Sequence, residues 1–262
     1  MREYLQNFIL VLIDIDNFMK KIALRIDDIG ASTKKFEVYS KIPGGNFLFL
    51  KYMKPFKAWA RYRELTGQDW ISIFKILEDF NAKLTVGITA AWVEKNSSLI
   101  PFPIRFPDEA AVLKEGLKKG LIEIANHGLT HCVVGKHRPR LFQSNRIFHR
   151  EFWDWLPTKT HYEHLLKSQD IMQNFFATEI VTLIPPGNVY CKATVEAAKK
   201  CNIQIINCQM LKNTQYPGIR CLSNDNVIAF HDRELVLNGI DWLKIKLSEL
   251  PDSTSYCFIK EL

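Results

Sequence analysis

Residues 22–30 read Ile-Ala-Leu-Arg-Ile-Asp-Asp-Ile-Gly, an apolar run that ends in two adjacent carboxylates and a glycine. The run from Ile22 to Ile26 is typical of a buried strand. Asp27 and Asp28 are hard to explain as packing, because adjacent like charges repel unless a cation lies near them. Asp-Asp before Gly is also a common turn sequence. From this stretch alone, a turn and a functional site are both open interpretations.

Similar short apolar runs recur along the chain, with helix-like stretches between them. The predicted strands are Ile22–Ile26, Leu84–Ile88, Ile122–Ala125, Ile180–Ile184, Ile203–Asn207 and Val227–Phe230. The predicted helices are Trp70–Phe80, Glu109–Lys119, His161–Phe176 and Ala193–Cys201. This alternation predicts an α/β fold with a largely parallel sheet, open or closed into a barrel.

The chain of 262 residues is long enough for one large domain, and we expect a single domain over 1–262. Within it, 1–20 is an N-terminal extension. Two segments, 34–69 and 136–159, are basic and aromatic and fit the alternation poorly, so we interpret them as insertions. Loops of this length are often lids or binding loops.

The formal charge of +7 concerns partners more than fold. A nucleic acid, an anionic substrate, a membrane surface and mere solubility would each account for it. The sequence has no helix-turn-helix, zinc-finger or RNP-like motif, so we expect no nucleic-acid partner.

Six cysteines without a Cys-x-x-Cys pair indicate reduced thiols in a cytoplasmic protein. The apolar run Phe8–Ile13 is shorter than a secretory signal needs, and no run approaches the roughly 20 residues of a membrane span. We therefore predict no transmembrane segment. Peripheral contact with the inner face of a membrane stays open.

Two histidines follow another predicted strand, in the sequence Asn126-His127-Gly128-Leu129-Thr130-His131. Histidines at i and i+4 can bind one metal from a helical turn, although the spacing alone is a weak signal. Their place after a strand matches that of Asp27-Asp28, and sites in α/β folds gather at the carboxyl ends of strands. His231 also follows a predicted strand, which makes it a candidate general acid.

One Asp and two His make three ligands for a divalent ion and leave a position open for water, the catalytic pattern. Zinc can lower the pKa of bound water from about 15.7 to about 7. A second carboxylate can accept the proton of the water, and a histidine can protonate a leaving nitrogen. This set of groups predicts the hydrolysis of an amide or ester.

The order of the motifs resembles that of the polysaccharide deacetylases with a NodB homology domain. The motifs that carry the resemblance are Asp27-Asp28, His127 with His131, Pro185-Pro186-Gly187, and Ala229-Phe230-His231. The resemblance implies an irregular (β/α) barrel with fewer than eight strands. It also implies that Asp28, His127 and His131 bind a metal, which we expect to be zinc. Asp27 would be the general base and His231 the general acid.

The activity implied by the resemblance is removal of an N-acetyl or other acyl group from an amino sugar. The Arg-Ile-Asp-Asp-Ile-Gly opening and the insertion after it look like the branch associated with surface polysaccharide or lipopolysaccharide synthesis. Two alternatives stay open: a catalytically impaired carbohydrate-binding relative, and a deformylase or amidohydrolase acting on a lipid-linked sugar.

One departure from the family pattern concerns the arginine that usually holds the base aspartate, because Ile184 stands in its place. Arg25 and Asp27 share a face of a strand, so Arg25 is a candidate to orient the base instead. A salt bridge from Arg25 to another partner is the alternative.

The substrate-binding candidates are Pro186, Gly187, Asn188, Arg138, Arg140 and Trp153. In 136–159, six basic residues against two acidic ones give a charge of +4. Arginine suits phosphate and carboxylate, and tryptophan suits a sugar face, so we expect an anionic amino sugar as substrate. A basic solvated loop is the alternative.

Two further features have simpler interpretations. Cys132 could be a fourth ligand, but we favour a buried thiol. We expect His161 and His164, at i and i+3, to lie on a solvated helix face.

Overall fold

The computed structural model describes residues 21–36, 47, 62–134, 150–209 and 216–262. Its main sheet has eight strands, and every pairing in that sheet is parallel. These strands are β1 (Lys21–Ile29), β2 (Leu84–Ile88), β5 (Ile122–Asn126), β6 (Thr182–Leu183), β7 (Ile205–Asn207), β8 (Arg220–Leu222), β9 (Val227–His231) and β10 (Ser255–Cys257). The predicted parallel α/β architecture is therefore confirmed.

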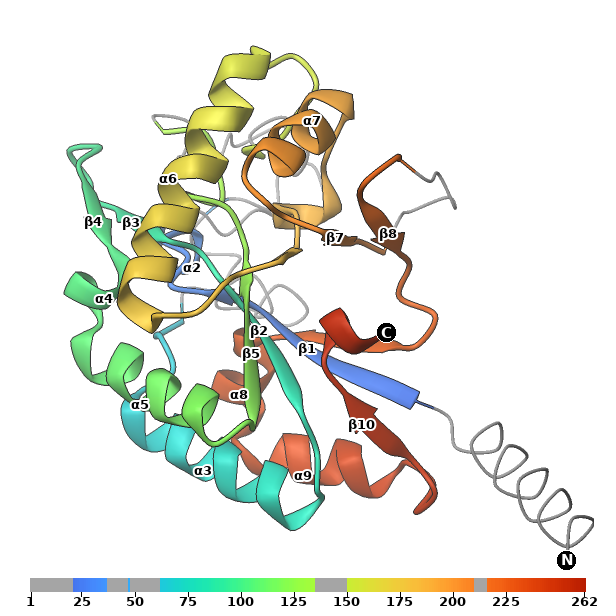
Figure 1. Cartoon of the computed structure of the whole chain (residues 1–262). Coiled ribbons are helices and arrows are strands. Elements are labelled where there is room, and N and C mark those ends of the chain that lie inside the picture. Colours follow the sequence, from blue (N-terminus) through green and yellow to red (C-terminus); the bar gives the residue numbers. More distant parts are fainter. Residues whose placement is uncertain (1–20, 37–46, 48–61, 135–149, 210–215) are drawn as a thin grey trace, which may run out of the picture.

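Helices pack on the outside of the curled sheet (Figure 1). They are α2 (Thr33–Phe36), α3 (Gly67–Asp79), α4 (Phe102–Arg105), α5 (Pro107–Lys118), α6 (Thr158–Phe176), α7 (Lys192–Lys200), α8 (Asp232–Asn238) and α9 (Asp241–Ser248). Two 3-10 turns, η3 (Pro186–Asn188) and η4 (Ile259–Glu261), and a hairpin of β3 (Ala91–Val93) with β4 (Leu99–Pro101) complete the described elements. None of these helices is long and apolar enough to cross a membrane.

The strand order around the sheet is β9-β1-β2-β5-β6-β7-β8. β9 and β10 both pair with Ala23 of β1 and so lie on opposite sides of it. β2 and β9 both pair with Leu24, which puts β10 on the β2 side. The eight strands therefore occupy seven positions (8 − 1), in agreement with the predicted barrel of fewer than eight.

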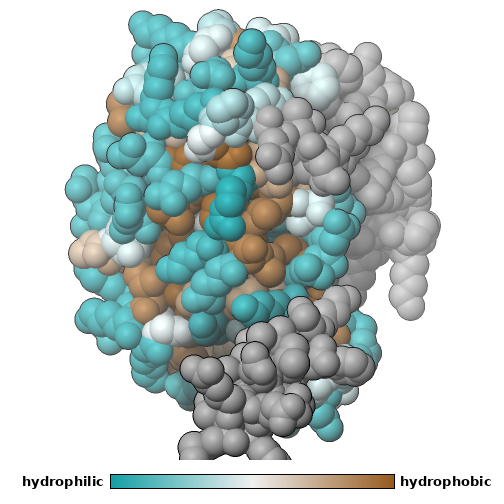
Figure 2. All heavy atoms as spheres, turned by 45° about the vertical axis from the view of Figure 1, so that its right-hand side comes forward, coloured by the Kyte–Doolittle hydropathy of each residue, from teal (hydrophilic) through white to brown (hydrophobic). Residues whose placement is uncertain are grey.

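The ends of this order are β8 and β9, and no pairing joins them among the described strands, so the barrel is incomplete there. Figure 2 views the molecule with the right-hand side of Figure 1 turned forward. On this face, hydrophobic residues gather at the centre and hydrophilic residues surround them.

Alternation along β1 sorts its side chains between the two faces of the sheet. Ile22, Leu24 and Ile26 pack in the large outer core with residues of α3, α5 and α9. Ala23 belongs to the inner apolar cluster, which also holds Ala125, Ile184, Ile205, Val227, Cys257 and Ile259. Because side chains alternate along a strand, Arg25 and Asp27 share the inner face with Ala23.

The helix α3 begins with a capping box, in which Thr66 and Asp69 bond each other's backbone N–H groups. Its apolar face packs on α5, and the closest approach is at Gly116 of α5. A Cβ at Gly116 would lie 2.3 Å from Cζ of Phe74 on α3. The absence of a side chain at this position therefore sets how closely the two helices pack.

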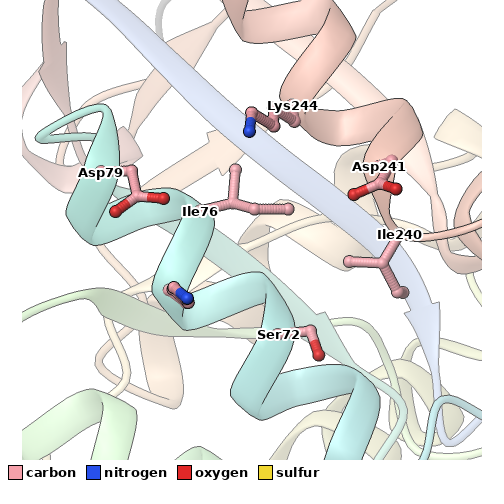
Figure 3. Close-up of a pocket in the computed structure, with 7 residues that line it drawn as sticks. Ser72, Ile76, Asp79, Ile240, Asp241 and Lys244 are labelled. Atoms are coloured by element: carbon pink, nitrogen blue, oxygen red, sulfur yellow. The ribbon is translucent and has the colours of Figure 1, made fainter.

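A groove of about 350 Å³ lies between α3 and α9, and side chains from both helices point into it (Figure 3). Lys75 and Lys244 line it together with Asp79 and Asp241, so its charges balance. It shares no residue with the carboxyl ends of the strands.

The last residues of both predicted insertions are helical. Residues 67–69 belong to α3, and Thr158 and Lys159 belong to α6. At the start of the first insertion, Lys34 lies in α2 and is fully buried. The extension 1–20 and the segments 37–46, 48–61 and 135–149 fall outside the described residues.

Lys34 belongs to a buried polar network that joins separate parts of the chain. Its Nζ contacts Glu64 Oε2 at 2.7 Å and also pairs with Asp232. Glu64 Oε2 accepts from the backbone N–H of Gly30 at 3.1 Å, and the Tyr62 hydroxyl donates to Asp232 Oδ1 at 2.9 Å. The turn after β1, the α2 helix, the segment before α3 and the start of α8 are thereby held together.

Candidate metal centre

The end of β1 carries a bulge at the two adjacent aspartates. Between Ile26 and Ile29, β1 has one residue more than the paired stretch Val86–Ile88 of β2. Asp28 adopts a left-handed φ of 69°. Regular alternation would send the side chains of Asp27 and Asp28 to opposite faces, and a bulge re-aims one of them. Both carboxylates can therefore face the same site at the carboxyl end of β1.

Asp28 lies against both histidines of the His-x-x-x-His motif. Its Oδ1 is 3.1 Å from Nε2 of His127 and 3.0 Å from Nε2 of His131. The three candidate ligand atoms lie within 4.8 Å of one another, and both histidines are buried. The structure thus brings together all three residues predicted as metal ligands.

His127 is held by the backbone immediately after β6. Its Nδ1 is 2.8 Å from the carbonyl oxygen of Ile184, and a carbonyl can only accept, so Nδ1 carries a proton. On the other side of the ring, Nε2 lies 3.1 Å from Asp28 Oδ1. A donated N–H on the far side of the ring is typical of histidine metal ligands. His127 and Asp28 therefore fit a divalent ion.

His131 has a different partner. Arg150 Nη1 lies 2.8 Å from its Nδ1 and 3.3 Å from its Nε2. A guanidinium only donates, so in this arrangement Nδ1 accepts and Nε2 carries the proton that faces Asp28. Ligation through Nε2 requires that this proton leave and that Arg150 turn away from Nδ1. The donor set fits a metal with this one rearrangement.

Burial and neighbouring charges set the ionisation of Asp28 and His131. Burial acts to raise the pKa of Asp28, but His131 and the hydrogen bonds with both histidines outweigh it and hold that pKa well below its ordinary value. Burial, followed by the Arg150 guanidinium, lowers the pKa of His131 to about 4. At neutral pH the carboxylate is therefore ionised and the His131 ring is neutral.

Arg25 contacts Asp27, as the shared strand face suggested. Arg25 Nη2 donates to Asp27 Oδ2 at 2.8 Å, and both side chains are buried. Arg25 Nη1 also bonds Asn207 Oδ1 at the end of β7 and Asn224 Oδ1 at 3.3 Å. Asp27 Oδ1 is buried and has no hydrogen-bond partner among the described residues. One oxygen of Asp27 is thus fixed, and the other is a free acceptor.

Asn207 is a residue that the sequence interpretation missed as part of the site. Its Nδ2 donates to the carbonyls of Leu222 and Ser223 at 3.0 and 3.2 Å, which fixes the amide that holds Arg25. The available signal was its place as the last, polar residue of a predicted strand, the same kind of position that Asp27 and His127 occupy.

His231 reaches the site through strand pairing. It lies opposite Asp27 in the register of β1 and β9 and caps the N-terminus of α8. Its side chain is partly exposed, and its Nδ1 lies 3.7 Å from Glu234 Oε2. The ring therefore lies beside Asp27 and is reached by solvent.

The predicted substrate-binding residues have mixed positions. Pro186 is buried beside Gly128, where a Cβ would lie 3.1 Å from the proline ring. Gly187 packs under Arg150, and Asn188 Oδ1 accepts from the backbone N–H of Gln209 at 3.0 Å. Trp153 is half-buried in the turn before α6. Arg138 and Arg140 lie outside the described residues, so their substrate contacts stay a prediction.

The expectation for His161 and His164 is wrong. His161 is fully buried and its Nδ1 contacts the Thr194 hydroxyl at 3.0 Å, while His164 Nδ1 contacts Glu151 Oε1 at 2.6 Å. Their face of α6 packs against α7 and the segment before α6, which the spacing alone did not reveal.

The preference for Cys132 as a buried thiol agrees with the structure. Its Sγ is buried 3.9 Å from His131 Nδ1, and burial raises its pKa to about 11. It therefore stays protonated at neutral pH. None of the six cysteines, all of which lie among the described residues, forms a disulfide.

A curled parallel sheet with an Asp-His-His set at the carboxyl ends of its strands defines a (β/α)-barrel protein with a candidate metal centre. The profile of the polysaccharide deacetylase family matches residues 66–206, more than half of the chain, and the chain belongs to that family. The matched segment contains both histidines and η3. Asp27, Asp28 and His231 lie outside it and reach the site by the pairing of β1 with β2 and β9.

Several solved structures share the fold. A family 4 acetyl xylan esterase from Clostridium thermocellum, in complex with a cobalt ion, is 12% identical, with a TM-score of 0.50 over 92% of this chain and 89% of that one. A 4-alpha-glucanotransferase from Thermococcus litoralis is 15% identical, with a TM-score of 0.51 over 93% of this chain and 40% of that one.

A mutant of a CE4 family pseudoenzyme with restored enzymatic activity is 14% identical, with a TM-score of 0.49 over 94% of this chain and 68% of that one. Its wild-type form comes from Bacillus anthracis. No curated protein matches the sequence. Because these sequence identities are 12–15%, the likeness to solved structures shows a shared fold and does not extend to activity.

Proposed function

We propose that the protein is a metal-dependent hydrolase that removes an N-acetyl group from an amino sugar in glycan or surface polysaccharide biosynthesis. The observation that carries the proposal is the contact of Asp28 Oδ1 with Nε2 of both His127 and His131. The ion we propose is zinc, because two histidines and one carboxylate with an open position are typical of catalytic zinc.

A bound ion would polarise the amide carbonyl and lower the pKa of a coordinated water. Asp27 has an oxygen available to accept a proton from the attacking water, since Arg25 occupies only Oδ2. His231, across the strand pair from Asp27, would donate a proton to the departing amine. Arg25 would take the orienting role that the family arginine, replaced here by Ile184, has elsewhere.

The substrate we propose is anionic. Support comes from the basic composition of 136–159 and from Arg150, whose guanidinium lies beside His131 and against Gly187 of η3. A guanidinium at this place suits a carboxylate or phosphate on the sugar. We place the reaction in the cytoplasm on the basis of the cysteine pattern, since six cysteines without a Cys-x-x-Cys pair are typical of reduced thiols.

Elemental analysis of the purified protein, with the variant His127→Ala, tests the proposal. We expect about one divalent ion per wild-type chain and loss of most of it in the variant, because one of three ligands is removed. Cys132→Ala is the matched control beside the site and should keep the ion.

The same preparations would be screened against neutral and anionic acetamido sugars for released acetate. Bound metal with turnover of an anionic sugar supports the proposal. A metal-free wild-type chain, or retention of the ion by His127→Ala at the wild-type level, would contradict it and favour a non-catalytic carbohydrate-binding protein.

A further inference from the structure

A buried glutamate behind the metal-site loop holds the backbone of that loop. Glu151 is fully buried, and its carboxylate accepts from three successive backbone N–H groups. Oε1 accepts from Leu129 at 2.8 Å, and Oε2 accepts from Thr130 at 3.2 Å and His131 at 3.0 Å. One carboxylate therefore satisfies consecutive donors of the loop that carries both histidines.

This loop has a backbone that needs external support. Gly128 and His131 both adopt left-handed φ angles, 83° and 67°. Such a conformation is unfavourable for a residue with a Cβ and persists when surrounding contacts impose it. Successive N–H groups turned toward one point form an anion-binding concavity, which Glu151 fills from within the chain.

Two contacts place Glu151 in that concavity. The preceding residue, Arg150, pairs with Cys132 across an antiparallel backbone bridge. On the other side, His164 of α6 contacts Glu151 Oε1 at 2.6 Å. The carboxylate also explains the glycine between the ligands, since a Cβ at Gly128 would lie 2.2 Å from Glu151 Oε2.

We propose that Glu151, oriented by His164, is a positioning residue of the metal centre. Its carboxylate fixes the loop backbone in the conformation that places Nε2 of His131 3.0 Å from Asp28 Oδ1. The inference rests on the metal-dependent function proposed above. It extends that function to a residue that no sequence motif marked.

A second buried glutamate provides a matched control. Glu123 on β5 is also buried, and it accepts from the hydroxyls of Thr85 and Thr182 at 2.8 and 2.6 Å. Its contacts lie inside the barrel and do not include the histidine loop. Glu123→Gln and Glu151→Gln therefore perturb the same kind of buried carboxylate, but only the second one touches a ligand-bearing backbone.

The test measures the dissociation constant of Co²⁺ by competition with a chelator, together with the visible spectrum of the bound ion. In Glu151→Gln an amide nitrogen replaces one acceptor oxygen, so at least one loop N–H loses its partner. We expect the affinity to fall by about 10–100-fold, as for other outer contacts of metal ligands, with an altered Co²⁺ spectrum. Glu123→Gln should keep the wild-type dissociation constant and spectrum even if its melting temperature falls.

The side chain of His164 is partly exposed, so His164→Gln should fold readily. We expect it to weaken Co²⁺ binding by less than Glu151→Gln does. It serves as the test variant if Glu151→Gln does not fold. If Glu151→Gln folds and binds Co²⁺ with wild-type affinity, the inference is overturned while the proposed function stands. The same holds if only His164→Gln folds and its affinity is unchanged. Equal weakening in Glu123→Gln would overturn it too. A wild-type protein that binds no Co²⁺ would overturn the proposed function, and this inference with it.

Discussion

Two adjacent carboxylates at the end of β1 have different surroundings. Asp28 faces two histidines, whereas Asp27 faces the guanidinium of Arg25. Adjacent residues on a regular strand point to opposite faces, so the bulge between Ile26 and Ile29 is what lets both serve one site. This local geometry suits Asp28 and Asp27 to the different roles proposed for them, metal binding and proton transfer.

This division predicts separable effects of substitution. Asp27→Asn and His231→Ala should keep the metal, because neither side chain belongs to the Asp28-His127-His131 set. Both should lower kcat by about 10²-fold or more, since each removes a proton-transfer group. Elemental analysis and steady-state kinetics on the acetamido sugar found by the screen would check this. Near-normal kcat in either variant would remove that residue from the mechanism.

At the same scale, the sequence allowed prediction of the three residues that meet at the candidate metal centre, but not of their neighbours. Asp28, His127 and His131 each follow an apolar run, and the carboxyl ends of parallel strands meet at one edge. The contacts of Arg150 with His131 and of His164 with Glu151 depend on where the chain returns after 135–149. Residue spacing carries no information on that return, which is why His164 was expected on a solvated face.

At the contact of α3 with α5, the substitution Gly116→Ala has two opposing effects on stability. Gly116→Ala should favour the helix by about 1 kcal/mol through intrinsic propensity. The new Cβ would, however, lie 2.3 Å from Phe74, and overpacking of this kind costs about 1–3 kcal/mol. We expect net destabilisation, measured by urea unfolding.

Gly67→Ala, in the first turn of α3, is the matched control. A Cβ there would lie 3.5 Å from Val112, an ordinary contact. This variant should be neutral or slightly more stable than the wild type. A gain in stability for Gly116→Ala as well would show that Phe74 yields easily and that the contact is loosely packed.

The length of the apolar pattern in the sequence decided which elements were predictable. The helices α3, α5, α6 and α7 repeat an apolar face over several turns, and each was predicted with ends shifted by a few residues. The strands β8 and β10 have three residues each, too few for a period of two to appear. β6 pairs over only Thr182–Leu183, although the apolar run that predicted it is longer.

For the whole molecule, the network around Lys34 predicts a dependence of stability on pH. Burial outweighs the attraction of Lys34 and raises the pKa of Glu64 to about 7. A carboxyl whose pKa is higher in the folded state contributes stability that is complete below the unfolded pKa of about 4.5. That contribution is lost as pH rises through about 7.

Glu64→Gln tests this sign, because it removes the titrating proton but keeps the size of the side chain. The wild-type free energy of unfolding should fall between pH 4.5 and pH 7.5 by more than that of the variant, with a difference on the order of 3 kcal/mol or less. Glu115→Gln, at an exposed pair with Lys118, should follow the wild-type curve. Parallel curves for all three proteins would contradict the assignment to Glu64.

The bridge between Cys132 and Arg150 has a consequence for how this protein can change. The chain leaves the metal centre and returns to it at two residues that are paired, so the stretch between them is attached at neighbouring points. Loops with adjacent ends tolerate exchange and changes of length. A change in the length or sequence of the stretch between Cys132 and Arg150 can therefore leave the two bridged residues in place. Both histidines and Glu151 lie outside that stretch, so the candidate metal centre can persist while the connection diverges.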